Sequence, residues 1–281
     1  MEAVARQRRH RFNFRGSLNI PFVVFMVFFV IIPLFLILFY AFTDAEGHFS
    51  LKNWADIFSS AEKWKTIGMT FLVAFATTAI CLLIAYPIAF ILSNKKFNKN
   101  KVLVYVFLLP MWVNFVVRTM ALKDMLNVAF ITMFKTQLTA SYPLLGTIVG
   151  MVYDYLPFAI LPLYNQMLKM DKNQIEAAAD LGANPVRVFY KVIIPMTVPG
   201  IISAATMTFM PTMSSYVIAF HMSNGKLPII GTLIEFYFNT GTGGYNSGAV
   251  LSLVMLIIIG FSLVAEKLSD KKDDSRKAGI W

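Results

Sequence analysis

Long apolar stretches alternate with shorter polar stretches along the whole chain. A helix needs roughly 20 mostly apolar residues to cross the hydrocarbon core of a bilayer. Six stretches meet this length, at about 20–42, 67–93, 102–122, 144–168, 196–220 and 247–266. The pattern predicts an all-α integral membrane protein with six transmembrane helices. It divides the chain into a basic N-terminal tail (1–19), a transmembrane domain (20–268) and a charged C-terminal tail (269–281).

Composition agrees with this class and excludes others. Hydrophobic residues make up 57% of the chain and charged residues only 14%, whereas about a quarter of an average soluble domain is charged. The net charge of +10 does not predict nucleic-acid binding, because the basic residues lie in loops between apolar stretches. The first apolar stretch follows basic residues but exceeds a signal-peptide core and lacks a small-residue cleavage site, so we expect an uncleaved first span.

The distribution of basic residues predicts the orientation. Lysine and arginine concentrate in the N-terminal tail, the loop after the second stretch, the polar loop 170–195 with the adjoining Lys169, and the C-terminal segment from Lys267 onward, which together hold 18 of the 25. Because cytoplasmic loops are enriched in Lys and Arg, we expect both termini in the cytoplasm. The polar loop 170–195 then lies on the same side, where ATP is available.

This polar loop, 170–195, is the most informative segment of the chain. It contains a helix-forming run from Gln174 to Leu181, then Gly182, and a second start at Asn184-Pro185 that we expect to end at Pro195. Gly182 permits a left-handed helix cap, and Pro185 suits the first turn of a helix. The pattern predicts a rigid helix–turn–helix elbow, which is typical of a docking element.

The elbow also resembles a known loop. Permeases of ABC importers carry Glu-Ala-Ala, three residues, Gly, nine residues and Ile-x-Leu-Pro, and this chain has Glu176-Ala177-Ala178, Gly182 and Pro195 at that spacing. Val192 and Ile194 replace the Ile and Leu. Further segments are similar to the first permease subunit of spermidine/putrescine importers: 86–90 (YPIAF), 109–114 (LPMWVN), 118–119, 152–153, 156–158, 161–164 and 194–202.

This resemblance implies a type I ABC importer permease fold with a cytoplasmic coupling helix, in the cytoplasmic membrane of a bacterium. The implied partners are a homologous second permease, an ABC ATPase dimer, an extracytoplasmic substrate-binding protein and a polyamine substrate. The implied ATPase-coupling residues are Glu176, Ala177, Ala178, Asp180 and Gly182.

The chain has no phosphate-binding loop with which to hydrolyse ATP itself. Its Gly225-Lys226 pair lacks the glycine spacing and the following Ser or Thr of that loop. We therefore expect no cofactor in this chain, with ATP and Mg²⁺ bound by a partner subunit. The scattered histidines His10, His48 and His221 indicate neither a catalytic site nor a metal site.

A carboxylate lies within the fourth apolar stretch. Asp154 is flanked by Tyr153 and Tyr155, and a charged side chain at the bilayer centre is costly and should face the bundle interior or a water-filled cavity. A carboxylate between aromatic rings could hold a cationic substrate in the pathway. A hydrogen bond that only packs neighbouring helices explains Asp154 equally well. We expect Arg118 and Trp112, in the third stretch, to anchor the membrane interface.

The fifth apolar stretch carries small polar residues on one helical face. Thr208, Thr212 and Ser215 follow a spacing of four and then three residues, so they could line a pathway, although such residues also allow helices to pack closely. Three functions remain open besides polyamine import: import of another solute such as sulfate, iron or a sugar, ion-coupled secondary transport, and a membrane scaffold. Secondary transport predicts inverted repeats, which the sequence does not display.

Overall fold

The computed structural model describes residues 20–94, 102–241 and 244–278, so the expected N-terminal tail (1–19) lies outside the described residues. Within them the chain is helical, and a single β-bridge joins Thr43 to Phe49. Five described helices are long and apolar enough to cross a membrane, and the number is six if the bent pair Val102–Trp112 and Phe115–Phe134 forms one span. The predicted all-α membrane fold is therefore confirmed.

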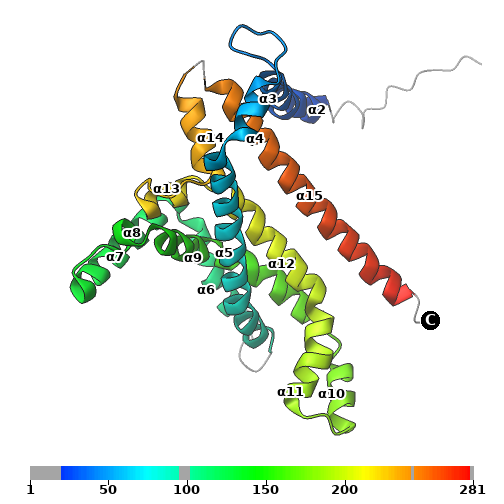
Figure 1. The fold of residues 1–281 in the computed structure, drawn as a ribbon. Coiled ribbons are helices and arrows are strands. Elements are labelled where there is room, and N and C mark those ends of the chain that lie inside the picture. Colours follow the sequence, from blue (N-terminus) through cyan, green and yellow to red (C-terminus); the bar gives the residue numbers. More distant parts are fainter. Residues whose placement is uncertain (1–19, 95–101, 242–243, 279–281) are drawn as a thin grey trace, which may run out of the picture.

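Helices α5 (Ala61–Ser93), α9 (Pro143–Leu168) and α12 (Ile194–Ser214) form the centre of the molecule and pack against one another (Figure 1). Small residues of α5 make the close approach possible. The side chains of Cys81, Ala85 and Ala89 are buried against Ile160 and Leu163 of α9. This buried surface is the main core of the protein.

The remaining helices surround this centre. In chain order they are α2 (Ile20–Met26), a π-helical turn (Val27–Ile31) and α3 (Ile32–Ala41), then α4 (Lys52–Ser59), α6 (Val102–Leu108), α7 (Phe115–Phe134), α8 (Leu138–Ser141), α10 (Lys172–Asp180), α11 (Pro185–Val188), α13 (Val217–Ser223), α14 (Ile230–Asn239) and α15 (Tyr245–Ala278).

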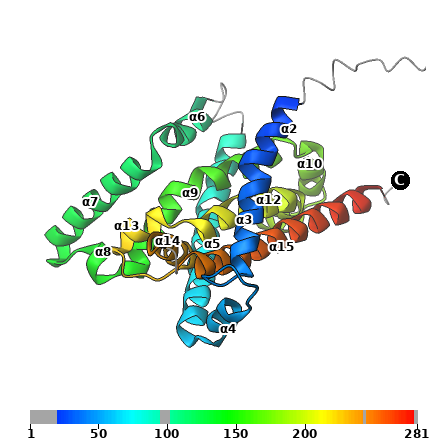
Figure 2. The same cartoon turned by 90° about the horizontal axis from the view of Figure 1, so that it is seen from above.

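The first span lies at the edge of the molecule. The α2–α3 run is 0% buried in its most apolar window, and Figure 2 shows it crossing above α12 and α15. Its end is held by Asn246 of α15, whose amide nitrogen donates to the carbonyl oxygens of Tyr40 at 3.0 Å and Thr43 at 2.6 Å. The exposed apolar surface of this run suits contact with lipid or with another membrane subunit.

The third predicted span, 102–122, is wrong as a single straight helix. Val102–Trp112 and Phe115–Phe134 meet at 94°. Pro110 lies in a 3₁₀ turn (Leu109–Trp112), and the side chain of Asn114 caps the new helix by accepting from the backbone N–H of Val116 at 3.0 Å. Because Asn114 begins a second helix in a new direction, α7 projects from the core (Figures 1 and 2).

Other boundaries also differ from the sequence pattern. Ser60 caps α5, which begins at Ala61 rather than near residue 67. The helix expected to end at Pro195 instead continues through a π-helical turn (Phe189–Ile193) into α12, so that one helical run spans Pro185–Ser214. That run stops at Ser214 and not near residue 220. Part of the expected C-terminal tail, through Ala278, belongs to α15.

Replacing each of two glycines in the long helices by alanine should have opposite effects on the stability of the fold. A Cβ at Gly146 of α9 would lie 2.8 Å from the backbone oxygen of Met222, whereas one at Gly68 of α5 would meet nothing within 4 Å. Because a main-chain oxygen cannot rotate away, we expect Gly146→Ala to destabilise the fold by about 1–3 kcal/mol. Gly68→Ala should be neutral or stabilise by up to about 1 kcal/mol.

Thermal unfolding of the two detergent-solubilised variants measures this difference. Equal melting temperatures for Gly146→Ala and Gly68→Ala would contradict the close α9–α13 contact.

Candidate functional site

The predicted elbow is present between α10 and α11. Asp171 caps α10, since its side chain accepts from the backbone N–H of Asn173 at 3.0 Å. Gly182 follows the helix with φ +80°, and its N–H donates to the carbonyl oxygen of Ala179 at 2.9 Å. Asn184 then caps α11 by accepting from the N–H of Arg187 at 2.8 Å. These local contacts determine the angle of the elbow.

The elbow protrudes from one end of the molecule (Figure 1). No residue of α10 is buried: Glu176, Ala177 and Asp180 are exposed, and Ala178 is half-buried. Leu181 at the tip is 89% exposed, and Val186 and Tyr190 are also exposed. An exposed apolar cluster rimmed by charged residues marks a protein interaction site.

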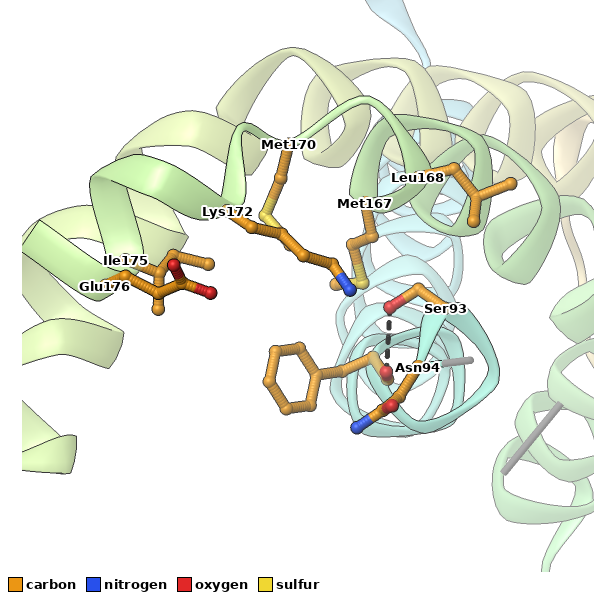
Figure 3. A pocket seen from close by; sticks show the side chains of 9 residues that line it. Ser93, Asn94, Met167, Leu168, Met170, Lys172, Ile175 and Glu176 are labelled. Atoms are coloured by element: carbon orange, nitrogen blue, oxygen red, sulfur yellow. Dashed lines mark hydrogen bonds between the residues drawn. The ribbon is translucent and has the colours of Figure 1, made fainter. Parts of the chain in front are cut away.

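A hollow separates α10 from the end of α5. Its volume is about 240 Å³, and its walls include Phe90 and Ser93 of α5 and Lys172, Ile175 and Glu176 of α10. Figure 3 shows Lys172 and Met170 pointing toward the end of α5, with Glu176 on the far side. The elbow is thus held by its connection to α11 and the following π-helical turn. A force on α10 would therefore reach α12 along the chain.

The second candidate site is a buried ion pair, and it corrects the expectation for Arg118. Asp154 has a partner within the chain, because the Nε of Arg118 donates to its Oδ1 at 2.6 Å. Arg118 is buried and is not an interfacial anchor. These two residues are the only Asp, Glu, Lys or Arg in the predicted spans 102–122 and 144–168. One basic and one acidic residue in two otherwise uncharged apolar stretches was the sequence signal that could have predicted their pairing.

Arg118 also connects three segments of the chain. Its Nη1 donates to the carbonyl oxygen of Pro110 at 2.6 Å, and its Nη2 to the carbonyl oxygen of Asp154 at 3.4 Å. The hydroxyl of Thr119 lies 2.7 Å from Oδ2 of the same carboxylate. The guanidinium therefore joins the 3₁₀ turn, α7 and α9 at the point where the third span breaks.

The two neighbouring tyrosines contact different groups. The Cζ of Arg118 lies 5.5 Å from the ring centroid of Tyr153, which is a cation–π distance. The hydroxyl of Tyr155 donates to the carbonyl oxygen of Pro211 in α12 at 3.2 Å. Tyr153 therefore supports the ion pair, whereas Tyr155 links α9 to α12.

The threonine face of α12 does not form an exposed surface. Thr208 and Thr212 are buried inside the chain, and their hydroxyls donate to the carbonyl oxygens of Ala204 at 2.8 Å and Thr208 at 2.7 Å. Ser215 is half-buried at the C-cap. These hydroxyls are satisfied by their own helix, so they can be buried at a helix contact.

Comparisons with known proteins agree with this geometry. Residues 83–270 match the family described as "Binding-protein-dependent transport system inner membrane component". A Haemophilus influenzae protein, described as spermidine/putrescine transport system permease protein PotB, is 32% identical over 88% of this chain and 92% of its own length. The Escherichia coli K12 protein of the same description is 30% identical over 71% of this chain and 77% of its own length.

Solved structures show the same fold. The crystal structure of a bacterial ABC transporter involved in the import of the acidic polysaccharide alginate has a TM-score of 0.69 and 13% identity, and the alignment covers 90% of this chain and 94% of that chain. Inward-facing MetNI methionine ABC transporter has a TM-score of 0.51 and 20% identity, over 74% of this chain and 93% of that chain. The matched residues include both the elbow and the buried ion pair, and the chain belongs to the inner-membrane permease family of binding-protein-dependent ABC importers.

Proposed function

We propose that the protein is a permease subunit of an ATP-driven polyamine importer. The observation that carries the proposal is the exposed Glu-Ala-Ala elbow, in a chain whose curated relatives are described as spermidine/putrescine permeases. The chain would form half of the pathway beside a homologous second permease. An ATPase dimer would bind ATP and Mg²⁺, and an extracytoplasmic protein would deliver the substrate. Both termini and the elbow would face the cytoplasm.

The geometry supports a direct mechanical route from the ATPase to the pathway. Residues Glu176, Ala177, Ala178 and Asp180 would meet the ATPase, and Gly182 would maintain the turn. The run Pro185–Ser214 is helical throughout, so movement of the elbow displaces α12 as one body. Because α12 packs against α5 and α9, that displacement reaches the core of the subunit.

An importer with the same fold could carry another solute. The solved relatives include alginate and methionine importers, but at 13% and 20% identity these share the fold alone. The two relatives described as polyamine permeases align over 92% and 77% of their own lengths and are more similar in sequence, at 32% and 30% identity. Polyamines are therefore the preferred substrate class.

Reconstituted uptake tests this function. The complete importer in vesicles should take up spermidine and putrescine only when ATP and the binding protein are supplied. A neutral sugar should not compete. Uptake of an unrelated solute instead of polyamines would reject the substrate class, and ATP-independent uptake driven by an ion gradient would reject the importer itself.

Gly182 predicts a conformational requirement at the turn. A Cβ there would meet nothing within 4 Å, so a substitution strains only the backbone at φ +80°. The strain for a β-branched residue is about 1–2 kcal/mol, whereas Asn tolerates this conformation. We expect Gly182→Val to lower ATP-driven uptake at least about tenfold and Gly182→Asn to retain most of it.

Gly47 provides the matched control, because it has φ +87° and similarly open surroundings, away from the elbow. Gly47→Val should leave uptake unchanged. An equal loss of uptake in Gly47→Val and Gly182→Val would show that any strained turn, and not the elbow, causes the defect.

Glu176 predicts a charge requirement at the docking surface. We expect Glu176→Lys to reduce uptake and the stimulation of ATPase activity by substrate, because the reversed charge opposes docking. Insertion and assembly should persist, since Glu176 is exposed. Glu62→Lys is the control, since Glu62 is also exposed but lies in the first turn of α5. Wild-type coupling in Glu176→Lys would remove this residue from the proposed contact.

A further inference from the structure

A cavity of about 270 Å³ leads from the surface to the Arg118–Asp154 pair. Its mouth is apolar and aromatic, and the side chains of Met111, Phe115 and Phe158 are exposed there. Its floor is ionic, because Asp154 is only 2% exposed. The cavity therefore places aromatic rings in front of a buried carboxylate.

This lining suits one chemical class of ligand. Aromatic faces attract cations, and a desolvated carboxylate pairs with an ammonium group. The methylene chain of an alkylamine would contact the apolar residues of the mouth. A sugar would find few hydrogen-bonding groups there. An anion would meet the aromatic faces and a guanidinium whose charge is already paired with Asp154. The lining thus favours an alkylammonium ion.

The carboxylate is already occupied by a cation of the chain itself. Arg118 donates from Nε to Oδ1 at 2.6 Å, and Thr119 lies within hydrogen-bonding distance of Oδ2. An incoming ammonium ion can reach Asp154 only if the guanidinium moves away. Arg118 lies on α7, four residues after Asn114, where the third span bends by 94°. Movement of α7 about this break would withdraw it.

We propose that Arg118 is a built-in counter-ion that the ammonium group of a polyamine replaces at Asp154 during transport. This inference rests on the proposed function and names the substrate contact within it. The exchange swaps one cation for another, so the buried carboxylate keeps a partner in both states. That matters because an unpaired buried charge is strongly destabilising. Arg118 is thus a positioning residue, and Asp154 is the group that touches the substrate.

The properties of the Arg118–Asp154 pair favour exchange with a substrate cation over a purely structural role. A buried ion pair is weak support for stability, because apolar residues of similar volume are often as stable. Ionisable groups at bilayer depth are instead characteristic of substrate pathways. The α7 helix that carries Arg118 makes its main contacts with α8, α9 and α13 and few with α5 or α12 at the centre. Movement of α7 would therefore leave most of the α5–α9–α12 contacts in place.

Binding of radiolabelled putrescine to the complete importer, without ATP and without the binding protein, tests the exchange. The apparent Kd is the intrinsic Kd divided by the fraction of protein with an open carboxylate. Arg118→Gln keeps hydrogen-bond donors but removes the competing cation, so it should bind putrescine at least about tenfold more tightly than wild type. Addition of Asp154→Asn should abolish the gain. The neutral isostere 1,4-butanediol should not compete.

Two controls separate the exchange from a general charge effect. Lys123→Gln removes a positive charge from the same helix and should leave putrescine binding unchanged. Phe75→Leu, at an exposed ring of α5, is the control for Phe115→Leu and Phe158→Leu at the mouth. The two mouth variants should raise the KM for putrescine uptake about threefold to tenfold while assembly persists.

The outcomes are distinct. If Arg118→Gln assembles but binds putrescine no better than wild type, the ion pair only holds α7 to α9 and the proposal is overturned. If Arg118→Gln fails to assemble, unchanged KM values in both mouth variants overturn it instead. The binding measurement needs no transport, so it is independent of the uptake that tests the proposed function. Uptake of another solute by the wild-type importer would reject polyamine import, and the putrescine-binding comparison would still decide the exchange.

Discussion

The need to satisfy every backbone polar group at bilayer depth shapes this protein more than any other constraint. No water is available there to accept from an N–H or donate to a carbonyl oxygen, so spanning segments must be helical. The long apolar stretches of the described chain obey this rule. Where the third span breaks, the carbonyl oxygen of Pro110 accepts a hydrogen bond from Arg118. The side chain of Asn114 caps the helix that follows. The break is possible because side chains replace the lost helical bonds.

The same rule explains how a distant surface can act on the core. The elbow protrudes, but it leads through the run Pro185–Ser214 without interruption of the helix. At Gly200 the helix approaches α9 so closely that a Cβ would lie 2.5 Å from a side-chain carbon of Gln166. A rigid rod in close contact transmits displacement well, because a packed interface does not deform gradually. The elbow is therefore joined to the core by a continuous and closely packed helix.

The ion pair adds a second kind of connection. Apolar packing and a few neutral hydrogen bonds, such as the one from Tyr155 to Pro211, hold α5, α9 and α12 together, whereas α7 is joined to α9 by the charged pair Arg118 and Asp154. Apolar packing is nonspecific in direction, but a guanidinium with three directional contacts specifies one position of the projecting helix. The described chain therefore combines an apolar core with a charged contact at its edge.

Much of this architecture follows from local sequence. The lengths of the apolar stretches predict the spans, and Gly182 with Asn184-Pro185 predicts the elbow, because caps and turns depend on adjacent residues. Tertiary structure decided the rest. Whether Asp154 was paired depended on Arg118, 36 residues earlier, and whether Thr208 and Thr212 faced outward depended on which side of α12 met its neighbours. Helical periodicity identifies a face, but only packing determines what that face contacts.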